Sequence, residues 1–154
     1  MTAKRATKAQ GLYEVIRCVR PAHRYLHRAV EQQLKDSGVT VGMRAVLERL
    51  AENGAQTAPE LARDLDIPRQ FAQRSINSLI GQDMAERLNN PAHKRSYLIR
   101  ITAKGRQTFE RIKADEHTSL KQLAQVLSAD DITAAQRVMR ALVDFYGPEQ
   151  DINP

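Results

Sequence analysis

The sequence contains only one cysteine among its 154 residues. It therefore forms no internal disulfide and no zinc site built from several cysteines, which suits a reducing compartment. No apolar run approaches the length of a membrane span, and no apolar stretch follows the basic first residues, as it would in a secretion signal. We expect a cytoplasmic protein with no membrane partner.

Sequence signatures of enzymes are also missing. The chain has no glycine-rich phosphate loop, no His-Glu-x-x-His and no Gly-x-Ser-x-Gly. Isolated carboxylates such as Glu60 fit helix caps better than catalytic pairs. We expect neither an enzyme nor a protein that depends on a cofactor.

The sequence does contain enough apolar residues for a core, and an excess of positive charge. Hydrophobic residues make up 42% of the chain, and 24 Lys+Arg against 18 Asp+Glu give a formal net charge of +6. Residues 63–104 hold eight Lys/Arg and four Asp/Glu, whereas residues 128–154 hold two and five. The first part of the chain is basic as well. This balance favours an anionic partner such as nucleic acid, without specifying a fold.

Helical periodicity covers the first third of the chain. Apolar residues recur every three or four positions from Leu12 to Leu34, which predicts one face of a long helix. Pro21 lies inside this run and should kink or restart the helix, because it lacks an amide donor. Gly38 marks the end of the run. A second helix is expected over residues 41–53.

The next segment predicts a helix-turn-helix. Thr57-Ala-Pro-Glu60 is a capping-box pattern that opens a short helix. Pro68 can begin the following helix, because its missing amide would be unpaired there in any case. Two short helices joined by a tight turn, the second with long polar side chains on its outer face, are typical of a DNA-reading motif. The second helix is expected to direct six residues toward the core: Phe71, Ala72, Ser75, Ile76, Leu79 and Ile80.

A basic hairpin is expected after the helix-turn-helix. Two extended segments, 85–90 and 96–102, flank a turn that ends at Arg95. A basic hairpin in this place is a wing. Two more helices follow, over 103–127 and from a Ser128 cap onward. The predicted fold class is mainly α with a small β-wing, in which a winged helix-turn-helix core is flanked by N- and C-terminal helices.

The residues expected to contact DNA lie on the second helix of the motif and at the hairpin tip. Glutamine can pair bidentately with adenine, and arginine with guanine or phosphate. An arginine at a wing tip can enter the minor groove. The alternative for each position is an ordinary solvated surface, and for His93 we prefer that alternative. The predicted contacts are Arg69, Gln70, Gln73, Arg74, Asn77, Lys94 and Arg95.

Over roughly residues 11–146 the chain resembles the multiple-antibiotic-resistance regulator (MarR) family. The flanking helices match, and the terminal Thr-x-Lys-Gly together with the helix-to-wing spacing is fairly specific. The resemblance rests on Leu61-Ala62, Leu65, Gln73-Arg74, Leu79, Arg87, Lys94-Arg95 and Ile101-Thr102-x-Lys104-Gly105.

The resemblance implies an obligate homodimer on a palindromic operator in double-stranded DNA. It usually implies repression that a small aromatic or lipophilic ligand relieves. The family's recognition-helix and wing arginines fall on Arg74 and Arg95. The implied organisation is a single domain over 1–154, with a winged helix-turn-helix core at 39–102 and dimerisation helices at 9–37 and 103–147.

Two positions depart from the family pattern. The family usually has an aspartate two residues before the wing arginine, where this chain has His93. In the family that aspartate orients the arginine, so the sequence of this chain does not define the pose of Arg95. The family's glycine at the end of the recognition helix falls on Asp83, which tolerates a left-handed backbone less well than glycine but better than most residues.

Further hypotheses concern the first two helices. One branch of the family senses hydroperoxides through a cysteine on the first helix, where Cys18 lies. The alternative is a partly buried packing residue. His23 and His27 have a zinc-ligand spacing, but no cysteine or acidic cluster lies near them in the sequence, and we predict no metal site. The family's ligand pocket suggests four lining residues: Tyr13, His23, Met43 and Leu47. The alternative function is a winged-helix protein-interaction module without DNA binding.

Overall fold

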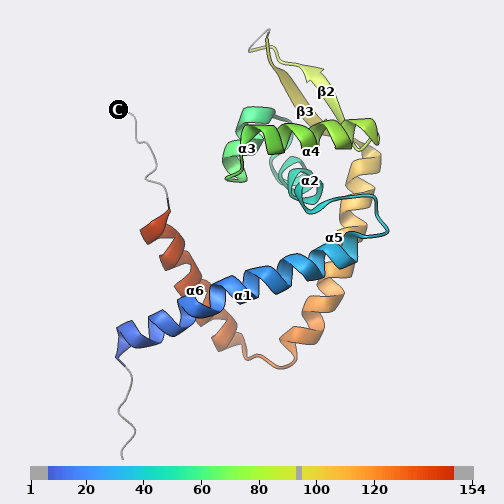
Figure 1. The fold of residues 1–154 in the computed structure, drawn as a ribbon. Helices are drawn as coiled ribbons and strands as arrows, with labels where there is room; N and C mark the ends of the chain where they lie inside the picture. Colours follow the sequence, from blue (N-terminus) through green and yellow to red (C-terminus); the bar gives the residue numbers. More distant parts are fainter. Residues whose placement is uncertain (1–6, 93–94, 148–154) are drawn as a thin grey trace, which may run out of the picture. The chain divides into compact units, whose positions relative to one another are not determined.

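The computed structural model describes residues 7–92 and 95–147 (Figure 1). Its described part is mainly helical, with six α-helices and three short strands. The chain divides into two compact units, one up to Glu116 and one from His117, and each is described by itself. The predicted fold class, mainly α with a small β-wing, is confirmed.

The first helix, α1, runs from Lys8 to Leu34. Thr7 caps it through a capping box with Gln10, in which each side chain bonds the backbone N–H of the other residue. The helix continues through Pro21, so the expectation of a restart there was wrong. A proline removes one amide hydrogen bond, and the hydrogen bonds of the other turns sustain the helix.

Three shorter helices build the centre of the first unit: α2 (Val41–Asn53), α3 (Ala58–Asp64) and α4 (Arg69–Gly81). The predicted capping box at the start of α3 is present, since Glu60 Oε2 accepts from Thr57 N at 2.7 Å and Thr57 Oγ1 accepts from Glu60 N. Pro68 stands at the N-cap of α4, as its missing amide predicts.

The sheet contains β1 (Gln56–Thr57), β2 (Ala85–Asn89) and β3 (Tyr97–Ile101), in the order β1-β3-β2 with antiparallel pairing. In the hairpin, Ala85 pairs with Ile101 and Asn89 with Tyr97. The strand β1 was not expected, because two residues carry no recognisable period. It attaches the start of α3 to the hairpin through β3.

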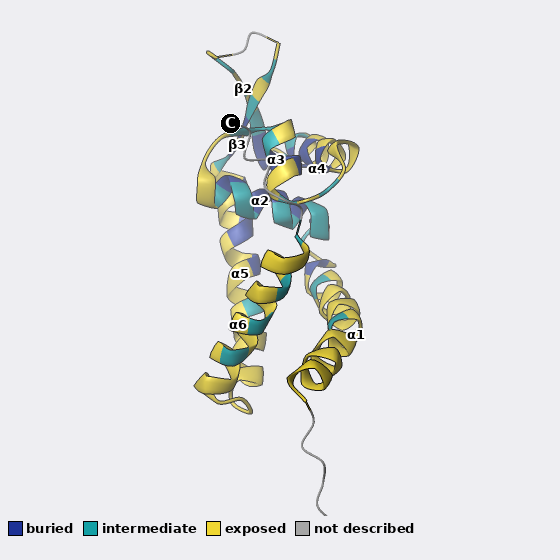
Figure 2. Cartoon of the chain, turned by 90° about the vertical axis from the view of Figure 1, so that its left-hand side faces the viewer, coloured by how far each residue is buried: buried dark blue, intermediate teal, exposed yellow. Residues whose placement is uncertain are grey.

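The core of the first unit lies among α2, α4, the sheet and the first half of α5 (Ala103–Ala124) (Figure 2). The largest fully buried side chains are Val46, Leu47, Leu50, Leu61, Ile76 and Leu79. Of the six residues expected to face the core from α4, Ile80 is partly buried and four others are buried. The expectation was wrong for Phe71, whose side chain is 54% exposed.

The second unit consists of the end of α5 and of α6 (Ala129–Tyr146). Ser128 caps α6 by accepting from Asp131 N, as expected. None of the α6 residues is buried. Among the described residues, no helix combines the length and the apolar character needed to cross a bilayer.

Candidate nucleic-acid interface

Helix α4 presents one buried and one exposed face. Its buried face carries Ala72, Ser75, Ile76 and Leu79, which fixes its rotation against α2 and the sheet. All five residues predicted from this helix to contact DNA are therefore on the outside: Arg69, Gln70, Gln73, Arg74 and Asn77. The structure brings these residues together on one side of a single helix.

Arg74 packs against the exposed Phe71. Its guanidinium carbon lies 4.6 Å from the centre of the phenyl ring, a cation–π geometry. The side chain of Phe71 therefore supports Arg74 at the surface instead of filling the core. Arg69 and Gln70 make no side-chain hydrogen bond or ion pair with any other described residue, so both are available to a partner.

A hydrogen-bond network joins α4 to the hairpin. Asn77 Oδ1 accepts from Gln73 Nε2 at 3.0 Å and from a terminal guanidinium nitrogen of Arg87 at 3.0 Å. Arg87 lies on β2, and its guanidinium is 6.0 Å from the ring of Tyr97 on β3. Arg87 was not among the predicted contacts, because its approach to α4 depends on how the hairpin packs.

The hairpin turn is held by Asn90. Its side chain accepts from Ala92 N at 3.0 Å and donates to Ser96 Oγ at 2.9 Å. Arg95 is exposed beside this turn. A groove of about 350 Å³ between α4 and the hairpin is lined by Gln73, Arg87 and Arg95, among others. Of the other predictions for the wing tip, Lys94 and His93 lie outside the described residues.

The Thr-x-Lys-Gly motif ties the base of the hairpin to the end of α4. Thr102 Oγ1 donates to Asp83 O at 2.7 Å and accepts from Gly105 N at 3.1 Å, while Lys104 Nζ donates to Gln82 O at 2.7 Å. Asp83 has a φ of 58°, the left-handed conformation anticipated at this position. These bonds fix the hairpin relative to the exposed face of α4.

Gly105 allows α5 to pass close to the chain after α4. A Cβ atom at this position would lie 2.0 Å from Met84 O, so that any side chain would collide with the backbone. The motif therefore requires glycine at this position, because α5 passes so close to the backbone of Met84.

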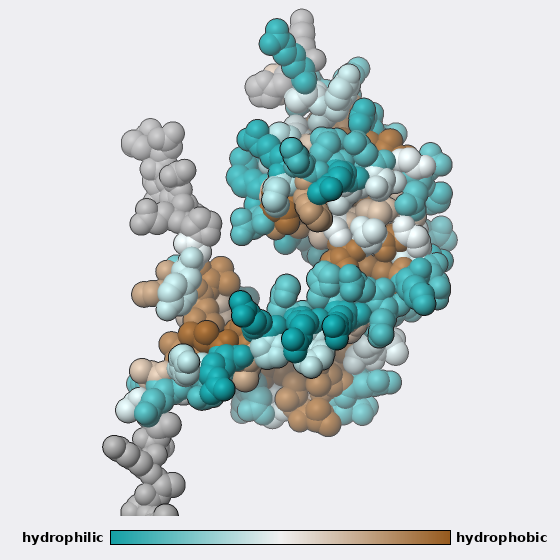
Figure 3. Space-filling view, in the orientation of Figure 1, coloured by the Kyte–Doolittle hydropathy of each residue, from teal (hydrophilic) through white to brown (hydrophobic). Residues whose placement is uncertain are grey.

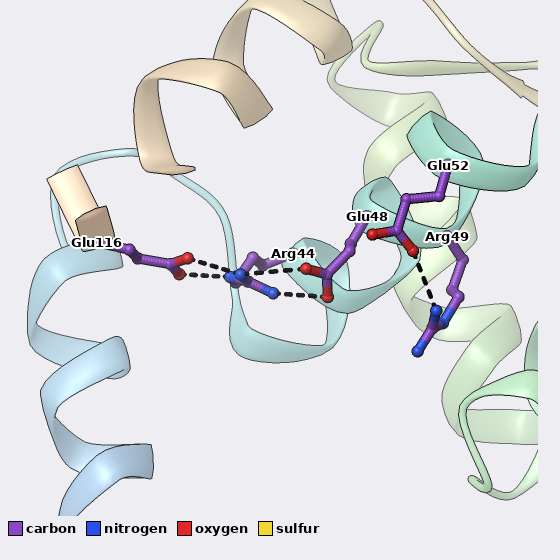
Figure 4. Close-up of polar contacts among 5 residues, drawn as sticks. All are labelled: Arg44, Glu48, Arg49, Glu52 and Glu116. Carbon is purple, nitrogen blue, oxygen red and sulfur yellow. Dashed lines mark hydrogen bonds and ion pairs between the residues drawn. The ribbon is translucent and has the colours of Figure 1, made fainter. Parts of the chain in front are cut away.

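A charged cluster joins α2 to α5 (Figure 4). Arg44 donates from Nε and a terminal nitrogen to the two carboxylate oxygens of Glu116, the second at 2.6 Å, and it also donates to Glu48 at 3.0 Å. The side chains of Arg44 and Glu116 are only 18% and 17% exposed. The bonds to Glu116 raise the pKa of Arg44 above its usual value, and burial opposes them. The cluster thus anchors α5 to the core below α4.

The predicted pocket residues lie in different environments. Met43 and Leu47 are buried in the core, whereas Tyr13 and His23 are exposed on α1. A separate open cavity of about 910 Å³ lies among α1, α2 and the start of α4, where His27, Leu34, Ala45, Ile67 and Phe71 are among its lining residues.

The reactive groups suggested on α1 are exposed. Cys18 is a free, exposed thiol in this chain, whereas the alternative made it partly buried. The rings of His23 and His27 are 6.2 Å apart. Over residues 7–92 and 95–147 no group of three or more His, Cys, Asp or Glu side chains could hold a metal ion.

The family model and a solved structure that is 34% identical identify the same family. A family model described as the MarR family matches residues 37–96. A crystal structure of a MarR family transcription regulator is 34% identical, with a TM-score of 0.84 over 90% of this chain and 92% of that one. Uncharacterized proteins of Mycobacterium tuberculosis and Mycobacterium bovis are 30% identical over 89 residues, which is 58% of this chain. The match spans 62% of the length of these relatives.

Two more distant structures share the fold. A mutant MarR from E. coli, in complex with operator DNA, is 21% identical with a TM-score of 0.76, covering 90% of this chain and 99% of that one. A Staphylococcus aureus MarR in complex with salicylate and kanamycin is 19% identical with a TM-score of 0.79, covering 86% and 90%.

Proposed function

The chain belongs to the MarR family of winged-helix transcriptional regulators, and from this premise we propose that it is a homodimeric, sequence-specific DNA-binding protein that acts as a ligand-responsive repressor. A family of transcriptional regulators also agrees with the expectation that the chain is not an enzyme. The observation that carries the proposal is the outer face of α4, where five exposed polar side chains lie beside an exposed basic hairpin.

In the proposed mechanism, α4 and the basic hairpin have different roles. The outer face of α4 reads base edges in the major groove through Arg69, Gln70, Gln73 and Arg74, and Arg95 reaches the minor groove from the hairpin. Phosphate contacts set the register on the duplex without reading sequence. The charge of residues 63–104 supports this assignment, because basic residues there outnumber acidic ones two to one.

Apolar faces on the terminal helices support a homodimer. On α6, Ile132, Met139, Val143 and Tyr146 are exposed at helical spacing and form one apolar stripe (Figure 3). On α1, Leu12, Val15, Ile16 and Leu26 form another exposed stripe. Exposed apolar surface of this extent is typical of an interface. We assign both stripes to contacts with a second copy of the chain.

Control by a small ligand would act through the spacing of two recognition helices. Half-sites of a palindrome lie about one DNA turn, roughly 34 Å, apart. A ligand that shifts α4 in one protomer would therefore spoil simultaneous docking of both. The open cavity at the start of α4 offers a second candidate site for an aromatic or lipophilic effector, besides the four residues predicted from the family.

The test is a titration of a fluorescent duplex selected from a random library, using the full chain. We expect Arg74→Ala to weaken binding at least about fivefold, in keeping with the value of about 1–3 kcal/mol for one bidentate base pairing. Arg111→Ala is the matched control, since it removes an exposed charge from α5. Equal effects of the two substitutions, or no DNA binding by the unmodified chain, would contradict the proposal. The latter result would favour a protein-interaction module.

A further inference from the structure

Three side chains from two elements meet at one oxygen atom on the outer face of α4. Asn77 Oδ1 accepts from Gln73, one turn earlier on α4, and from Arg87 on the neighbouring strand β2, both at 3.0 Å. All three residues are exposed, and Gln73 and Asn77 are on the proposed DNA-reading face. These hydrogen bonds therefore involve side chains that are proposed to contact DNA directly.

The chemistry of arginine fixes the orientation of both amides. A guanidinium carries only donors, so the atom of Asn77 that faces Arg87 must be the carbonyl oxygen and not the amide nitrogen. Because that oxygen also faces Gln73, Gln73 in turn must offer its nitrogen. Without Arg87, the Gln73–Asn77 pair could form its hydrogen bond in either direction, with donor and acceptor exchanged.

The fixed orientation determines what each amide presents outward. Asn77 has no other hydrogen bond in the described chain, so both N–H groups of its amide remain free, while its oxygen already accepts two bonds. Gln73 retains its free oxygen and one N–H. The amide of Asn77 is thus only a donor, whereas the amide of Gln73 keeps a donor and an acceptor side by side.

These two patterns suit different bases in the major groove. Guanine offers two adjacent acceptors, N7 and O6, whereas cytosine offers only the donor N4. Bidentate pairing with adenine requires one donor and one acceptor from the amide, which Gln73 retains and Asn77 does not. Asn77 in this state therefore favours guanine and rejects cytosine, and Gln73 favours adenine.

We infer that Arg87 is a specificity-determining residue: by donating to Asn77 Oδ1 it fixes the amides of Gln73 and Asn77, so that Asn77 reads a hydrogen-bond acceptor, guanine above all, and Gln73 reads adenine. This inference rests on the proposed DNA binding through α4. Arg87 acts as a positioning residue, because its effect on base choice is transmitted through Asn77.

The experiment is selection from a randomised duplex library, followed by affinity measurements on duplexes that carry each of the four bases at single positions. Asn77→Ala identifies the position that Asn77 reads, as the one whose preference disappears. Arg87→Met removes all donors but keeps an unbranched apolar side chain in place of the aliphatic part of arginine. We expect it to reduce the preference for guanine over adenine at that position by about tenfold, since adenine pairing becomes accessible to a reoriented Asn77.

Two matched variants separate orientation from charge. Arg87→Lys keeps a cation and a donor, and we expect it to retain most of the preference. Arg100→Met removes an exposed arginine from β3, where its partner is Glu86 and not α4. We expect it to weaken binding to all sequences alike. Thermal melts establish that each variant is folded.

Two outcomes would overturn the inference in different ways. If Arg87→Met weakens all duplexes equally, as Arg100→Met does, Arg87 is only a phosphate contact and the proposed function stands. If the unmodified chain selects no sequence at all, the inference and the proposed function both fail.

Discussion

Gly105 is the residue whose replacement by a larger one has the most direct structural consequence. Because Gly105 has no side chain, α5 can pass Met84 O so closely that a Cβ atom at this position would collide with it. We expect Gly105→Ala to destabilise the first unit by about 3 kcal/mol, because backbone has to move to accommodate one methyl group. A thermal or urea denaturation curve measures the change.

Gly81→Ala is the control for this substitution. Gly81 lies at the end of α4, and a Cβ there would meet nothing within 4 Å. Alanine should leave stability unchanged or raise it by about 0.5–1 kcal/mol, as for a glycine in a helix. If the two substitutions had equal effects, the close approach at Gly105 would not be a feature of the folded protein.

Some features of single residues could be predicted from the sequence, and others could not. The left-handed backbone at Asp83 follows from its place just after α4, where the family pattern has a glycine. The exposure of Phe71 does not follow, because its spacing fits the edge of the buried stripe and only the packing of α4 decides between core and surface. The contact between Arg87 and Asn77 likewise requires the packing of the hairpin against α4.

A partly buried ion cluster adds to the core packing that attaches α5 to α2. Arg44 bonds both oxygens of Glu116, a residue 72 positions later in the chain (Figure 4). We expect Glu116→Gln to destabilise the protein by about 2 kcal/mol, a typical value for a hydrogen bond to a charged group. The substitution removes the negative charge that Arg44 faces and one of the two oxygens that accept from it. Chemical denaturation monitored by circular dichroism measures this.

A double-mutant cycle tests whether the two residues act as a pair. Arg44→Met combined with Glu116→Gln should cost less than the sum of the single substitutions, by at least about 1 kcal/mol. The pair formed by Arg49 and Glu52 on α2 is a suitable comparison, since both side chains are more exposed, and its coupling should be below about 1 kcal/mol. Additive effects of Arg44 and Glu116 would show that they do not interact.

Most elements could be predicted from the sequence, because their signals are local. Capping residues, proline positions and the period of apolar side chains placed the helices within a few residues. The strand β1 was missed because two residues show no period, and it exists only through pairing with β3. The cluster around Arg44 was missed for a similar reason, since nothing local in the sequence relates α2 to a residue in α5.

At the scale of the whole molecule, we propose that the functional form is a homodimer that covers the apolar stripe of α6. We expect Val143→Glu to weaken self-association at least tenfold, because it places an unpaired charge in the apolar stripe of α6. Sedimentation velocity over a range of concentrations measures the dissociation constant. Ala141→Glu, which places the same charge at an exposed position on the opposite side of α6 from this stripe, is the matched control. If Val143→Glu leaves a dimer unchanged, or if the unmodified chain is a monomer, the assignment of the stripe is wrong.

The most direct test of the central claim, that this chain binds duplex DNA through α4 and the basic hairpin, is the salt dependence of its affinity for the selected duplex. We predict that the affinity falls at least about a hundredfold between 50 and 200 mM salt, as expected when about four phosphates are neutralised. Arg74→Ala and Arg95→Ala should each weaken binding, because each removes a group that pairs with a base or a phosphate. Where that group neutralises a phosphate, the salt slope should become shallower by up to about one. An affinity that does not change with salt, or that neither substitution alters, would contradict the account.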